Sequence, residues 1–197
     1  MSQSRLITNL VEILSYVDKF SKTLDIDVPS PLTTNDVTQF MAYNGYGDVA
    51  GVRISGRFQF VFDVRHHLID TFTDRRYAMT VLWRAESIKP LIQPSKISKE
   101  QALEMACQCL TKLRYSGDKL PPLLPPRVHQ WKWDPPGATK TDPLPFFTVE
   151  WQWKKNPDVT YCRIEIDGFR QKLTDFNIMY PLRDIFPPGP PAPAGKE

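Results

Sequence analysis

The chain has few of the features by which several large classes of protein are recognised. It holds only three cysteines, Cys107, Cys109 and Cys162, and no CxxC motif. Such a sparse, odd set is not a disulfide framework, and it weakly favours a reducing compartment. We expect Cys109 and Cys162 to be buried and inert, whereas Cys107 points to the other side of a predicted helix. No run of 18 apolar residues occurs, so we predict no membrane span.

A strong excess of one charge is also missing. The 25 basic and 22 acidic side chains leave a net charge of +3, spread along the chain. Nucleic-acid-binding proteins usually carry a concentrated basic stripe, so we predict no nucleic-acid partner. The first residues, MSQSRLITNL, lack the basic and apolar regions of a signal peptide. We therefore expect a cytoplasmic location by default, and an exported one if a leader has been removed.

Motifs of catalysis are absent from the sequence. It has no phosphate-binding loop, dinucleotide fingerprint, zinc motif or nucleophile elbow. The neighbours His66 and His67, with Asp63 and Asp70, are the best candidates for a metal site or an enzyme. A polar hairpin turn is the favoured interpretation, because a metal needs three or four ligands in a set geometry. We predict that the chain is no enzyme and uses no cofactor.

What the sequence does contain is an internal similarity. Residues 60–74 (FVFDVRHHLIDTFTD) align without a gap on residues 164–178 (IEIDGFRQKLTDFNI), so that Phe72 falls on Phe176. A repeat of this kind indicates two copies of one supersecondary unit. A weaker upstream similarity joins residues 32–41 (LTTNDVTQFM) to residues 97–106 (ISKEQALEMA).

Hydrophobic periodicity predicts the elements. Apolar residues at helical spacing predict helices over residues 4–24 and 97–113, the second opened by a capping box of Ser98 and Gln101. We predict a short third helix in the first copy, opened by Thr33 and Asp36. Alternating patterns predict strands over residues 49–54, 57–63, 68–73, 128–133, 146–153, 159–167 and 172–178. Residues 77–83 form either a further strand or a connector.

Side-chain size predicts how the second copy packs. Its helix offers the small residues Ala102, Ala106 and Cys109, which allow a sheet of bulky side chains to approach closely. Four tryptophans, Trp131, Trp133, Trp151 and Trp153, alternate along two strands and are expected to face this helix. A stacking platform for sugars, bases or peptides is the less favoured alternative. Glu150, Glu165 and Asp167 fall on the opposite face, which we expect to be solvated.

The capped helix of residues 97–113, followed by strands that end in RIEIDGFRQKLTDFNI, resembles the PepSY-like and cystatin-like families. The sequence departs from the PepSY hairpin pattern in placing its glycine, Gly168, directly after Asp167. The resemblance implies a non-catalytic module of the kind found in peptidase propeptides and envelope proteins. We therefore expect an α+β protein made of tandem helix-on-antiparallel-sheet modules with an extra N-terminal helix.

The expected organisation has four parts. They are an N-terminal helix and connector (1–31), a first module (32–86), a second module (97–180) and a disordered proline-rich tail (181–197). A proline-rich insertion over 119–145 interrupts the second module. Such a long loop is often functional in a compact domain.

The sequence favours a binding or interaction module over an enzyme. A protein or peptide is the expected partner, and a role in regulating a peptidase follows from the family resemblance. We predict the working surface on the polar side of the second sheet: Arg127, Lys132, Glu150, Gln152, Arg163 and Glu165. A small-ligand pocket between helix and curled sheet is the alternative. The oligomeric state stays open.

Overall fold

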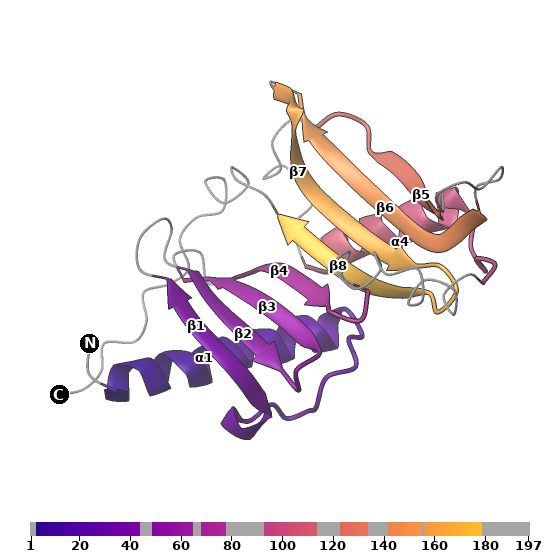
Figure 1. Ribbon diagram of the computed structural model, residues 1–197. Coiled ribbons are helices and arrows are strands. Elements are labelled where there is room, and N and C mark those ends of the chain that lie inside the picture. The colour runs from indigo at the N-terminus through magenta and orange to yellow at the C-terminus, as the bar shows by residue number, and fades with distance from the viewer. Residues whose placement is uncertain are drawn as a thin grey trace.

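The computed structural model describes residues 3–43, 49–64, 68–77, 93–113, 123–133, 142–154 and 156–178. Two long helices are present in this part of the chain, α1 (Gln3–Thr23) and α4 (Lys99–Lys112). The strands are β1 (Val37–Tyr43), β2 (Val49–Ile54), β3 (Phe58–Asp63), β4 (Leu68–Asp74), β5 (Arg127–Trp133), β6 (Asp142–Trp153), β7 (Asn156–Asp167) and β8 (Lys172–Ile178). They form one antiparallel sheet in the order β1-β2-β3-β4-β8-β7-β6-β5 (Figure 1).

The continuous sheet corrects the prediction of tandem modules. Strands β4 and β8 pair directly, through Thr71 with Asn177, Phe72 with Phe176 and Thr73 with Asp175. A four-stranded sheet would leave unpaired backbone groups along both edges. Joining β4 to β8 removes two of those edges, and the eight described strands then share one sheet. The two regions of internal similarity are therefore neighbours within a sheet and not separate modules.

The predicted third helix is also wrong. A single 3-10 turn, η1 (Thr34–Asp36), is followed at once by strand β1. The Asp36 carboxylate accepts hydrogen bonds from the Thr33 amide and hydroxyl, both at 2.8 Å, so the expected cap forms over only one turn. The sequence VTQFMAY after it is rich in β-branched and aromatic residues, which favour a strand.

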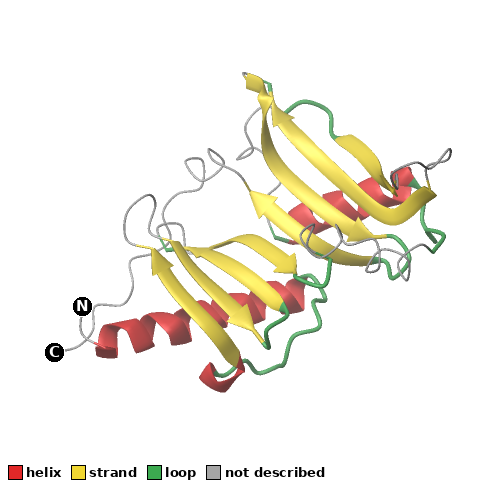
Figure 2. Ribbon diagram, in the orientation of Figure 1, coloured by secondary structure: helices red, strands yellow, loops and turns green. Residues whose placement is uncertain are grey.

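Helix α1 is no extra element, because it covers the first four strands (Figure 2). Its core side chains recur at helical spacing and are buried. They are Ile13, Leu14, Val17, Phe20 and Leu24. The predicted helices 4–24 and 97–113 are confirmed, and so is the capping box, in which Ser98 Oγ accepts from the Gln101 amide. All seven firmly predicted strands are present, while the segment after Tyr77 lies outside the described residues.

One apolar row crosses the entire sheet. Side chains directly opposite in antiparallel strands point to the same face. The row consists of Phe40, Val52, Phe60, Phe72, Phe176, Ile164, Val149 and Val128. These residues belong to, or pack against, the single core cluster that also holds the inner residues of α1 and α4. Both helices therefore cover the same face, as Figure 2 shows, and we call the opposite side the helix-free face.

The tryptophans divide between the two faces. Trp151 is buried in the core and Trp153 packs against it, as predicted. Trp131 instead belongs to the helix-free face, where its Nε1 donates to Thr148 Oγ1 at 2.6 Å and its ring contacts Phe146. The side chain of Trp133 lies outside the described part. The expectation that all four face the helix is therefore wrong for Trp131.

Candidate functional site

Two polar rows run across the helix-free face of strands β5 to β8. In the first, Arg127 lies opposite Glu150, Glu150 opposite Arg163, and Arg163 opposite Asn177. The second row contains His129, Thr148, Glu165 and Asp175. Adjacent strands are about 4.8 Å apart, so side chains in one row can contact each other directly.

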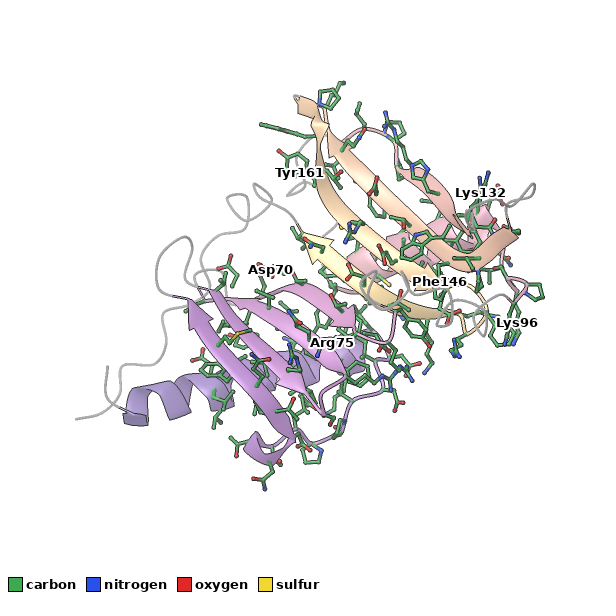
Figure 3. All side chains as sticks on the ribbon, viewed as in Figure 1. Asp70, Arg75, Lys96, Lys132, Phe146 and Tyr161 are labelled. Carbon is green, nitrogen blue, oxygen red and sulfur yellow. The ribbon has the colours of Figure 1, made fainter. Side chains whose placement is uncertain are left out.

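The register brings four of the six predicted surface residues together. Arg127, Glu150 and Arg163 share a row, and Glu165 lies two residues from Arg163 along β7. Lys132 and Gln152 are separated from this group by register shifts, after Gln130 in β5 and after Trp151 in β6. Lys132 is exposed, near the α4 end of β5 (Figure 3).

Two carboxylates face each other at the centre of this surface. Glu165 and Asp175 are directly opposite in register and only 8% and 9% exposed. Arg163 serves both, at 3.6 Å from Glu165 Oε1 and 3.7 Å from Asp175 Oδ1. Glu165 and Asp167 are buried, so the expectation of a solvated acidic face is wrong for these two residues, whereas Glu150 is half-buried.

Burial changes the acidity of this pair. Desolvation is the main cause that raises the pKa of Glu165 to about 7, with repulsion from Asp175 adding to it and Arg163 opposing it. Desolvation also raises the pKa of Asp175, although a hydrogen bond from Thr73 and the charge of Arg163 act against that rise. One guanidinium is thus shared by two acids that are costly to ionise together.

Sequence reasoning missed several residues of this face. Thr73 Oγ1 donates to Asp175 Oδ2 at 2.7 Å, although the two residues are 102 positions apart. Thr148 receives the Trp131 indole hydrogen bond and is itself buried. The contact of Thr73 depends on the pairing of β4 with β8, for which no local signal exists. One signal in the sequence does place Asp175 on this face. Successive residues of a strand point to opposite faces, and its neighbour Phe176 is apolar.

The basic and acidic side chains of this face differ in their exposure to solvent. Arg127 and His129 are exposed, Arg163 and Glu150 are half-buried, and the carboxylates of Glu165 and Asp175 are buried. Solvent and any partner therefore meet basic groups first. A partner that presents acidic side chains would be attracted to this surface.

A second charged cluster lies where β4 ends near the β7–β8 turn. Arg57 and Arg76 both bind the buried Asp74, at 2.7 and 2.8 Å, while Arg170 binds the buried Asp167 at 2.8 Å. The pocket among them encloses about 30 Å³, which is room for about one or two waters. These arginines already hold carboxylates, so the cluster stabilises the strand ends and is no ligand site of useful size.

The cysteines and histidines are the remaining candidates for chemistry that the sequence offers. Burial raises the pKa of Cys109 to about 11 and also raises that of Cys162, so neither thiol is activated. Cys107 is exposed, as expected. His66 and His67 lie outside the described residues. Within the ranges that the structure describes, no group of three or more potential metal ligands is found.

Comparison of the chain with protein-family models, curated proteins and solved structures finds no match. The resemblance to PepSY-like and cystatin-like families accordingly stays a prediction. No helix in the described part of the chain has the length and apolar character needed to cross a membrane.

Proposed function

We propose that this chain is a non-enzymatic binding module whose partner docks on the helix-free face of strands β5 to β7. The observation that carries the proposal is the sorting of charge on this face, with Arg127 and His129 outermost and the carboxylates of Glu165 and Asp175 buried. The partner that fits is a protein segment rich in Asp and Glu. Buried acids beneath Arg163 hold its guanidinium in place, which lowers the entropy lost when a partner binds it.

Arg127 is the most informative residue for a test. It is exposed at the edge of the sheet, opposite Glu150, so its replacement leaves the core untouched. Arg163 is less suitable because it also compensates Glu165 and Asp175, and its removal would leave two buried acids without a cation.

The experiment is a selection from a displayed library of random peptides on the full chain. We expect enrichment of acidic peptides, with affinity that falls as salt is added. Arg127→Glu should weaken the selected peptide about tenfold or more, whereas Lys99→Glu on the exposed side of α4 should leave binding unchanged. Enrichment of neutral or basic peptides, or equal losses in both variants, would contradict the proposal.

The finer identity of the partner follows from the family resemblance. PepSY-like domains accompany peptidase propeptides, so a peptidase is the partner class that we propose to test next. The alternative of a small-ligand pocket under α4 has no supporting observation among the described residues, where Phe147, Val149 and Trp151 fill that space as core.

A further inference from the structure

Among the strands that the structure describes, β1 forms one edge of the sheet. Its sequence, VTQFMAY, contains neither a charged residue nor a proline. Proteins normally protect exposed edges with charge, proline or a bulge. A register shift does occur at Thr38, but it lies at the start of the strand and leaves Gln39–Tyr43 in regular pairing with β2. Most of β1 therefore lacks the charge, proline or bulge that would protect an edge.

The opposite edge, β5, is built differently. It carries Arg127, His129 and Lys132, and it follows directly after Pro125 and Pro126. All three charged or ionisable side chains of β5 are exposed. The contrast indicates that β5 is protected against pairing with another strand, whereas β1 is not.

The pairing of β4 with β8 shows how two strands of this chain pair across a pair of phenylalanines. At the β4–β8 junction, Phe72 meets Phe176 in an antiparallel pair with the helices on one side. Phe40 belongs to the same apolar row and is its outermost member on the β1 side. It is also the central residue of β1, so two copies of β1 running antiparallel would place Phe40 against Phe40.

Helix α1 supplies a second observation at the same edge. Phe20, near its C-terminal end, contacts Phe72 and Phe176 at the centre of the sheet. From there the helix runs toward β1, and its N-terminal turns extend past that strand (Figure 1). Val11 of α1 is 57% exposed, the highest value among the large apolar side chains that the structure describes.

We propose that the chain forms a homodimer in which β1 of each copy pairs antiparallel with β1 of the other about a two-fold axis. Such a contact is self-complementary and closes after two subunits. The protected β5 edges stop the sheet from growing further. Because the axis stands perpendicular to the sheet, both helix-free faces lie on the same side. The dimer thus presents two copies of the proposed binding face on one side. A partner that carries two acidic segments would bind both copies with higher avidity.

Sedimentation of the full chain at rising micromolar concentrations tests the proposal. We expect a species of twice 22.7 kDa. Phe40→Lys and Phe40→Glu should each raise the dimer dissociation constant about tenfold or more, because like charges then meet at the axis. Mixing the two variants in equal amounts should restore the dimer, since opposite charges then face each other. Val128→Lys and Val128→Glu are the matched controls, because Val128 ends the same row at the β5 edge.

Three results would overturn the proposal. The wild-type chain could stay monomeric, the dimer could persist in both Phe40 variants, or the Val128 variants could dissociate it. Circular dichroism shows whether the Phe40 variants are folded. If they are not, Gln39→Lys and Gln39→Glu replace them, because Gln39 is outside the core and its two copies would be diagonal neighbours across the axis. Failure of the Gln39 mixture to re-form the dimer would then count against a symmetric β1 contact.

Discussion

Phe72 of β4 lies directly opposite Phe176 of β8, and this pair joins the two halves of the sheet. Both side chains are fully buried, and Phe20 of α1 contacts both rings, with centroid distances of 6.3 and 5.6 Å. These are the two phenylalanines that the internal sequence similarity aligns. The aligned residues are therefore partners in space, related by a local two-fold axis between β4 and β8.

Truncation of this pair is expected to be among the most destabilising changes in the chain. Phe72→Ala and Phe176→Ala should each lower the free energy of unfolding by about 3–5 kcal/mol. The double variant should lose less than the sum, because the two rings share contacts. Urea denaturation measures all three, with Val64→Ala, an exposed residue, as a control that changes stability by no more than about 0.5 kcal/mol. If the losses of the two single variants added up in the double variant, the two rings would not stabilise the β4–β8 junction together.

Stability should fall as the pH rises through the weakly acidic range. Burial raises the pKa of Glu165 from 4.5 to about 7, so the folded chain binds this proton more tightly than the unfolded chain does. The free energy of unfolding should therefore decrease from about pH 4.5 to about pH 7, by up to about 3 kcal/mol, and level off above. Asp175 acts in the same direction.

The variant Glu165→Gln should remove most of that fall and raise stability at pH 8, because position 165 then buries no charge beside Asp175. Glu104→Gln, at an exposed position of α4, should keep the wild-type profile. Melting temperatures across pH 4 to 8 make the comparison. A Glu165→Gln profile that still falls as steeply would show that other groups are responsible.

The hydrogen bond from Thr73 to Asp175 crosses the junction and can be tested on its own. Thr73→Val should cost about 1–3 kcal/mol, because it leaves a buried carboxylate oxygen without its donor. Thr71→Val is the matched control, since Thr71 lies two residues earlier on the same strand and face. Chemical denaturation gives both values. Equal effects would mean that the hydroxyl of Thr73 contributes nothing specific.

Gly168 is required by close packing of the backbone. A Cβ atom there would lie 2.7 Å from the Phe147 ring and 2.8 Å from the Pro145 carbonyl oxygen. Gly168→Ala should therefore destabilise the chain by about 2 kcal/mol or more. At Gly51 the nearest atom would be 3.7 Å away, so Gly51→Ala should be tolerated far better. Thermal melting compares them, and similar melting temperatures would contradict the packing argument.

Local patterns in the sequence were sufficient for most elements. Alternating residues such as Cys162, Ile164 and Ile166 gave strand β7 and its core face, and helical spacing gave α1. The segment after Thr33 predicts a helix, although the structure has a strand there, because the spacing of Val37, Phe40 and Met41 also fits a short helical face. Its alignment with the helical residues 97–106 favours the same interpretation. A seven-residue segment can satisfy both periods, and its tertiary pairing with β2 decides.

The candidate site was only partly predictable. Alternation placed Arg163 and Glu165 on one face, and pairing brought Arg127 and Glu150 beside them. The depth of Glu165 and its contact with Asp175 depend on the continuous sheet, which no local pattern specifies. Burial of a carboxylate is a property of the assembled surface, whereas a charged position in an isolated strand pattern predicts a solvated side chain.

The proposed partner binds the helix-free face of β5 to β7. An NMR titration of the isotope-labelled chain with the selected acidic peptide would locate this binding residue by residue. We predict shift changes at Arg127, Glu150 and Arg163 and little change along α4. Changes centred on Ala106 and Val149, between helix and sheet, would contradict the claim and support an internal ligand pocket instead.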